Sequence, residues 1–163
     1  MINNKQHWKN ICTGRILTEE FIHENKYLVD WNLISRCQNL RESFINEHID
    51  QVNLPSILRC QEISEDFLEK HIVRFDANCW KIISKCITLS EDFIEKHVDV
   101  LYWPYISRYQ NVSESFLLKF QDKVNWKSIF DKYTLTKRTL GLLVAKEWGS
   151  EKIKRMFMQQ LSA

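Results

Sequence analysis

Apolar residues recur along this chain at a spacing that predicts short amphipathic helices. The stretch ISEDFLEKHIV at 63–73 returns almost unchanged as LSEDFIEKHVD at 89–99. In the second copy the apolar face has the i, i+1, i+4, i+5 spacing of one helical side, at Phe93, Ile94, His97 and Val98. Both stretches are therefore predicted to be helices with the same buried face.

The same pattern occurs six times between residues 8 and 139. Successive units start 23 residues apart, with one interval of 26, at Trp8, Trp31, Leu54, Trp80, Trp103 and Trp126. An isoleucine follows three positions after every start. A phenylalanine follows thirteen positions after the first five starts, and Thr139 takes that place in the sixth unit. Six copies in phase predict a repeat protein.

Each unit is predicted to contain two helices. The first carries the W-x-x-I stripe, with capping residues directly before it at Asp30, Asn53 and Asn125. Pro55 and Pro104 fall in its first turn, where proline is tolerated. The second helix opens with a hydroxyl cap, at Thr18, Ser64, Ser90, Ser113 and Thr136. In most units acidic residues follow this cap and suit the helix dipole.

Helices of two or three turns are not stable alone in water, so each unit must be covered by its neighbours. Only three glycines and two prolines also favour helices joined by short turns. We therefore predict an all-α fold, a short α-solenoid of stacked two-helix repeats. It would form a single domain over 1–163, with repeats at about 8–30, 31–53, 54–79, 80–102, 103–125 and 126–139.

Two parts of the chain depart from this regularity. The third unit has Leu54 in place of tryptophan and three extra residues within VRFDANC at 73–79. We expect a longer loop there, either a tolerated insertion or a local bend or contact loop. A C-terminal cap is predicted over about 137–163, with one helix ending at Gly149 and a basic amphipathic helix after Ser150. A membrane-surface or calmodulin-target helix is the alternative interpretation of that last segment.

Composition excludes few functions. The net charge of +2 gives no general argument for nucleic acid, a membrane or an acidic substrate. The N-terminal MINNKQHWKN is polar and lacks the apolar stretch of a signal peptide, and no apolar run approaches a membrane span. With five cysteines and no CxxC pair, we expect reduced thiols in a cytoplasm, the host's if the protein is viral.

Three ladders of residues could carry chemistry, and each has a structural interpretation that we favour. His48, His71 and His97 share one position, but units about 9–10 Å apart do not suit the 2.0–2.1 Å bonds of zinc. Phe120 takes that position in the fifth unit, so we expect half-buried packing histidines and predict no metal and no cofactor. A buried core role, rather than a Cys–His nucleophile, is predicted for Cys37, Cys60 and Cys86. A helix-capping role is predicted for Gln38, Gln61 and Gln110.

A fourth ladder is basic. It lies two residues after the buried isoleucine and should face outward, at Arg36, Arg59, Lys85 and Arg108. We predict these four residues as partner contacts, because a row of cations can meet acidic side chains or phosphates. The alternative is pairing inside the protein with acidic cap residues of a neighbouring unit, such as Glu65, Glu91 and Glu114. The ladder stops at Thr13 in the first unit and at Asp131 in the sixth.

The repeat also resembles a known one. The pattern W-x-x-I-S-[RK]-x-Q-x-[LIV]-S-E-x-F-I, present as WPYISRYQNVSESFL at 103–117, resembles a short repeat in proteins of bacteriophages and large DNA viruses. The resemblance covers about four fifths of the chain, with departures at Leu54, at Ile87 in place of glutamine, and in the sixth unit. It implies helical repeats and no reaction. Small phage proteins often bind and block a host component, so the resemblance implies that this chain inhibits a host protein, as an anti-CRISPR does.

We therefore expect a non-catalytic protein-binding module. The chain has no phosphate-binding loop, serine elbow or carboxylate pair suited to acid–base catalysis, so we do not expect an enzyme. The partner would be a host protein or protein complex, with no membrane involved. Nucleic-acid binding through the basic ladder is the alternative, and salt dependence would separate the two.

Overall fold

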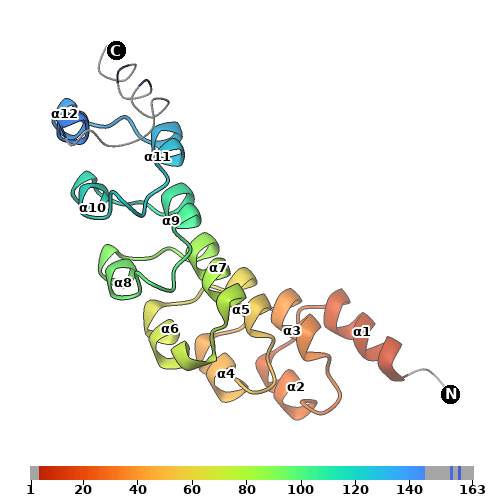
Figure 1. Ribbon diagram of the computed structural model, residues 1–163. Helices are drawn as coiled ribbons and strands as arrows, with labels where there is room; N and C mark the ends of the chain where they lie inside the picture. The colour runs from red at the N-terminus through yellow and green to blue at the C-terminus, as the bar shows by residue number, and fades with distance from the viewer. Residues whose placement is uncertain (1–3, 146–154, 156–157, 159–163) are drawn as a thin grey trace. The chain divides into compact units, whose positions relative to one another are not determined.

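The computed structural model describes residues 4–145, 155 and 158 (Figure 1). Within those residues the secondary structure is helical throughout, with twelve α-helices, one 3-10 helix and no strand. The chain divides into two compact units, Met1–Ile87 and Thr88–Ala163. The predicted all-α fold of stacked two-helix repeats is confirmed. The predicted end of one helix at Gly149 and the predicted start of another after Ser150 lie outside the described residues.

The first compact unit has two layers of helices (Figure 1). The first helices of four repeats pack on one another in chain order, and they are α1 (Asn4–Gly14), α3 (Trp31–Cys37), α5 (Leu54–Cys60) and α7 (Ala77–Cys86). The second helices form the other layer, and they are α2 (Glu19–Glu24), α4 (Glu42–Glu47) and α6 (Glu65–His71). The first three repeats therefore contribute one helix to each layer, and the fourth contributes α7.

The second compact unit is built in the same way. Its first helices, α9 (Trp103–Tyr109) and α11 (Trp126–Lys132), pack against each other. Its second helices are α8 (Glu91–Lys96), α10 (Glu114–Lys119) and α12 (Lys137–Ala145), of which α10 and α12 are in contact. That the two units form a single domain over 1–163 stays a prediction.

The predicted helix caps are present. Asp30 accepts hydrogen bonds from the backbone N–H groups of Asn32 and Leu33 at 3.0 and 3.3 Å. The hydroxyl of Ser64 accepts from the N–H of Phe67 at 3.2 Å. The remaining predicted caps accept equivalent bonds, at Thr18, Asn53, Ser90, Ser113, Asn125 and Thr136. Because these bonds satisfy amides that a helix start leaves open, they set where each short helix begins.

The prediction of a longer loop at 73–79 is wrong. Ile72–Arg74 form a 3-10 turn, and α7 begins three residues before Trp80, so it has ten residues where α3, α5, α9 and α11 have seven. Asp76 caps the extended helix by accepting from the N–H of Cys79 at 2.8 Å. Phe75 packs edge-on against Trp80, with ring centres 5.7 Å apart. The inserted residues are thus folded into a turn and an extra helical turn.

The core is the apolar stripe of the repeat. Five of the six isoleucines placed three residues after a unit start are buried, at Ile34, Ile57, Ile83, Ile106 and Ile129. The start tryptophan stacks on the phenylalanine of its own repeat, as Trp31 does on Phe44 at 6.3 Å and Trp103 on Phe116 at 6.3 Å. Burying this stripe between neighbouring repeats is the main force that holds helices of six or seven residues in place.

The glutamines have the predicted helix-capping role, and they also tie the second, third and fifth repeats to the repeat before, which was not predicted. The amide oxygen of Gln38 accepts from the N–H of Leu17 at 2.8 Å, and its amide nitrogen donates to the carbonyls of Cys12 and Arg15, both at 2.8 Å. This closes the C-terminal end of α1 with a side chain from the next repeat. Further bonds to the preceding repeat are made by Gln61 and Gln110.

A second tie runs between the second helices. The carboxylate of Glu42 accepts from both the N–H and the hydroxyl of Ser64, the cap of the next second helix. Glu114 accepts from the N–H and hydroxyl of Thr136 at 2.8 and 2.6 Å. The first acidic residue of one helix therefore fixes the start of the next. The junction between the second and third repeats thus has a tie on each layer, from Gln61 and from Glu42.

Candidate partner-binding surface

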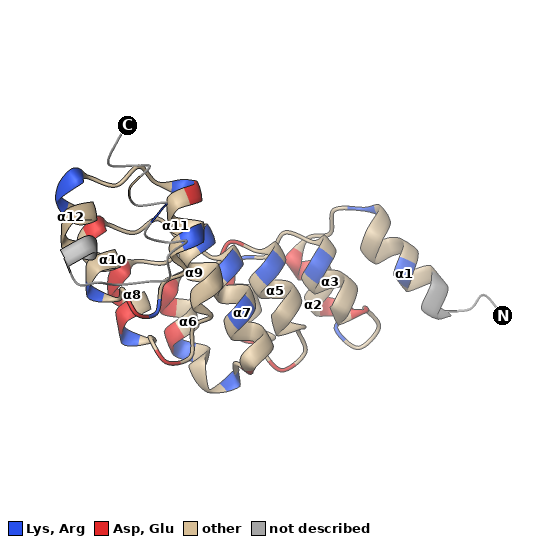
Figure 2. Cartoon of the chain, turned by 45° about the horizontal axis from the view of Figure 1, so that its top comes forward, with Lys and Arg blue, Asp and Glu red and all other residues tan. Residues whose placement is uncertain are grey.

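A row of basic side chains lies on the first-helix layer of the first compact unit. Arg36, Arg59 and Lys85 occupy the last turns of α3, α5 and α7, which pack in that order, and all three are exposed. Figure 2 shows Lys and Arg positions on each of these neighbouring helices. We call these three residues the basic row. Arg108 holds the same position on α9 in the second compact unit and is also exposed.

Helix geometry places the basic row outside. Each member lies two residues after a buried isoleucine, and two residues turn an α-helix by about 200°. The side chain therefore emerges on the face opposite the core. Because neighbouring first helices pack side by side about 8–10 Å apart, equivalent residues on α3, α5 and α7 form a line across the layer.

The structure also bears on the alternative of internal pairing. Glu91 and Glu114 instead accept hydrogen bonds from the cap residues Ser113 and Thr136. Within the described part of the chain, Arg36 and Arg59 make no hydrogen bond or ion pair. Those two guanidinium groups therefore keep all their donors available to a partner.

The second-helix layer uses its own charges differently. Arg41 pairs with Glu19, and Arg74 pairs with Asp50 at 2.8 Å. Burial opposes the ionisation of Glu19, but the hydrogen bonds and charge of Arg41 outweigh burial and lower the pKa of this carboxyl. Cations on that layer are thus used between repeats, in contrast to the unpaired arginines of the basic row.

The predicted core role of three cysteines is wrong. Cys37, Cys60 and Cys86 are exposed, each directly after a member of the basic row. The first helix ends at this residue, and the inward position passes to the next one, as at Gln38, which is buried. The structure brings no hydrogen-bonding histidine to these thiols within the described residues, so the predicted Cys–His alternative gains no support. Each member of the basic row is therefore followed by an exposed thiol at the end of its helix.

The other two cysteines are buried, at Cys12 and Cys79. Burial raises the pKa of both thiols, in Cys79 to about 11. Both thiols therefore stay protonated at neutral pH, which suits a packing role and not a nucleophilic one.

The histidine ladder packs as predicted, more deeply than the expected half-burial. The three side chains are buried, at His48, His71 and His97. Each ring lies 4.4–4.6 Å from the phenylalanine four residues earlier, as Phe120 does from Phe116. Burial lowers the pKa of His48 and of His71, so both are neutral at neutral pH. An aromatic ring thus fills this position from the second repeat to the fifth.

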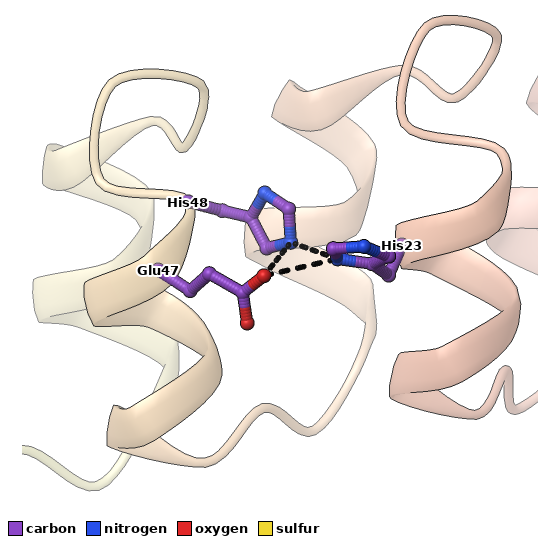
Figure 3. A group of neighbouring side chains, drawn as sticks. All are labelled: His23, Glu47 and His48. Carbon is purple, nitrogen blue, oxygen red and sulfur yellow. Dashed lines mark hydrogen bonds and ion pairs between the residues drawn. The ribbon is translucent and has the colours of Figure 1, made fainter.

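One cluster was not found from the sequence. His23 of α2 meets Glu47 and His48 at the end of α4 (Figure 3). The Nδ1 atom of His23 is 3.1 Å from Nε2 of His48 and 3.1 Å from a carboxylate oxygen of Glu47. The sequence held one signal for it, because a histidine stands fifteen residues after the unit start only in the first unit.

No protein family, curated protein or solved structure matches this chain. The fold and the surface define the class as a helical-repeat protein. Among the described helices, none combines the length and the apolar character that crossing a membrane requires.

Proposed function

We propose that this chain is a non-catalytic protein-binding module whose basic row, together with Arg108, contacts an acidic surface of a partner protein. The observation that carries the proposal is the regular exposure of Arg36, Arg59 and Lys85 on three packed helices, with the guanidinium groups of Arg36 and Arg59 unpaired. Arginine presents a planar fork of donors that suits carboxylates. A regular row of such groups suits several carboxylates at once.

The rigidity of the first compact unit supports this proposal. The backbone under the basic row is held by glutamine ties and buried isoleucines, so binding orders few additional groups in the module. The exposed thiols that follow the cations along each helix make this surface less polar than a continuous basic patch. This favours a protein partner over a phosphate backbone.

The concrete form that we propose is a bacteriophage or viral protein that acts in the host cytoplasm. It would bind a host protein or complex and cover its working surface, as an anti-defence inhibitor such as an anti-CRISPR does. The support for this form is the resemblance of WPYISRYQNVSESFL at 103–117 to repeats of phage and large-DNA-virus proteins.

Charge reversal of the row tests the proposal. The R36E/R59E variant should lose the partner that the unchanged chain captures from host lysate, as identified by mass spectrometry. The matched control is K26E/K70E, which makes the same change in net charge in the turn after α2 and on α6. Equal capture by all three proteins would show that the basic row is not the contact.

Nucleic-acid binding is the alternative, and salt separates it from protein binding. Three phosphate contacts would give a slope of about −2 to −2.7 in log affinity against log salt. Between 50 and 200 mM salt, that is roughly a 20- to 40-fold loss. Binding of single-stranded RNA with this slope, abolished in R36E/R59E, would replace the protein-binding proposal.

A further inference from the structure

Three potential metal ligands converge where the first two repeats meet. His23 lies near the end of α2, Glu47 is the last residue of α4, and His48 is the residue that follows α4. Figure 3 shows the two imidazole rings and the carboxylate pointing toward one another. The three ligand atoms are separated by 3.1 Å (His23–His48), 3.1 Å (His23–Glu47) and 4.0 Å (His48–Glu47).

We propose that His23, Glu47 and His48 form a zinc(II) site that links the first and second repeats. This inference is independent of the protein-binding function proposed above. Zinc bonds of 2.0–2.1 Å at tetrahedral angles place neighbouring ligand atoms about 3.3 Å apart. The observed separations bracket that distance, so side-chain rotations are enough to bring the three atoms into coordination.

The chemistry of the three groups suits zinc, which is intermediate between hard and soft metal ions. Two imidazole nitrogens and one carboxylate oxygen are ligands that zinc binds, and zinc sites with three protein ligands keep a fourth position open. His48 is 3 % exposed at its side chain, so its Nε2 atom is held at the inner end of the cluster. His23 and Glu47 are 45 % and 59 % exposed, so a metal ion can enter from solvent.

The surroundings are also favourable to a cation. His23 and Glu47 line a groove of about 370 Å³, whose other acidic walls include Glu20 and Glu24. The fourth coordination position would face this groove and could hold water or a partner side chain. Arg41, which also lines this groove, is paired with Glu19.

Three polar atoms of this cluster share few protons when no cation is bound. The Nδ1 atom of His23 carries at most one hydrogen, so it can donate to His48 or to Glu47, but not fully to both at 3.1 Å. If His48 donates instead, two lone pairs face each other at His23 and Glu47. One cation between the three atoms would satisfy all of them at once.

The ligand set is particular to this junction. At the next junction the position of His23 is taken by Asn46, whose side-chain oxygen lies 2.6 Å from Nε2 of His71. The position of Glu47 becomes lysine in the following three repeats, at Lys70, Lys96 and Lys119. A lysine there would repel a metal ion. Among the residues that the structure describes, the first junction is the one where three such ligands come within reach of one ion.

The test is calorimetric titration of zinc sulfate into the full-length, metal-stripped chain. The exposed thiols could also take zinc, so all proteins carry serine at Cys37, Cys60 and Cys86. We expect one zinc per chain. His23→Ala should weaken binding by at least the 10- to 100-fold typical of disturbed metal sites. The matched control is His7→Ala, which removes an exposed imidazole outside the cluster and should bind as the parent does.

A second readout separates coordination from folding. Zinc should raise the melting temperature of the parent and of His7→Ala, but not that of Glu47→Gln, which keeps the size of an exposed side chain. A cobalt(II) complex should show ligand-field bands without the intense thiolate charge-transfer band. Absence of zinc binding in the parent, or equal binding by His23→Ala and Glu47→Gln, would overturn the proposal.

Discussion

The glutamine tie makes the sharpest prediction about stability. Gln38 is a buried side chain whose amide makes three hydrogen bonds to the backbone of the preceding repeat. Gln38→Ala removes all three and leaves one N–H, of Leu17, and two carbonyls, of Cys12 and Arg15, without their partner. All three bonds measure 2.8 Å, so none of them can be discounted as weak.

The expected loss follows from these bonds. A buried hydrogen bond contributes about 1 kcal/mol net, so three give about 3 kcal/mol of unfolding free energy. Water can reach Arg15, which is exposed, and would recover part of the loss there. We therefore expect a loss of about 2–3 kcal/mol. At a urea dependence of about 1–3 kcal/mol/M, the unfolding midpoint should fall by roughly 1–3 M.

Urea unfolding followed by far-UV circular dichroism measures the effect. Asn39→Ala is the matched control, because Asn39 is the next residue and is exposed, and its change should stay within about 0.5 kcal/mol. Amide hydrogen exchange adds a local readout. The amide of Leu17 donates to Gln38 and should lose protection in Gln38→Ala more than amides elsewhere in the first compact unit.

Gln38→Glu sharpens the argument. The carboxylate keeps the shape and the acceptor for Leu17 but places an oxygen against the carbonyls of Cys12 and Arg15. It should destabilise at least as much as alanine at neutral pH and recover partly in acid, when a carboxyl O–H can donate. A loss below about 1 kcal/mol in Gln38→Ala, or unchanged protection at Leu17, would refute the tie as a source of stability.

Three further predictions test other layers of the structure. Burial opposes ionisation of Glu114, but hydrogen bonds from Thr136 and Thr139 outweigh burial and lower the pKa of this carboxyl. The contribution of Glu114 to the free energy of unfolding is therefore full above pH 4.5 and is lost as pH falls through the folded pKa. Glu114→Gln should flatten that part of the pH profile in urea titrations, and an unchanged profile would contradict the assignment. Burial, with the charges of Lys70 and Arg74, lowers the pKa of His71, so stability should decline as pH falls below 6.5 towards the folded pKa. His71→Phe should fold and lose that share of the decline, since phenylalanine fills the equivalent position in the fifth repeat. A disulfide reagent should titrate three thiols rapidly in the native protein and two more only on unfolding, and early reaction of the buried pair would be inconsistent with this packing.

The sequence by itself determined the architecture. Repeat phase, helix caps and the capping glutamines were all predicted, because they depend on residues within one repeat or on its nearest neighbour. The hydrogen bonds of Gln38 span 21 to 26 residues, close to one repeat length. In the sixth repeat Tyr133 replaces the glutamine, and its hydroxyl bonds to the N–H of Val112 and the carbonyl of Gln110. A period that short makes tertiary contacts nearly local.

The tertiary structure alone decided what faces solvent at the helix ends and what meets across a junction. Cysteine is as common in cores as isoleucine, so Cys37 was predicted inside, but the helix ends there and Gln38 takes the inward position. The fold of 73–79 depended on whether Asp76 could cap an added turn. The meeting of His23 with His48 depended on side chains from two different helices reaching the same point. Periodicity specifies which face of a helix is buried, whereas the directions of individual side chains at its ends follow only from the packed backbone.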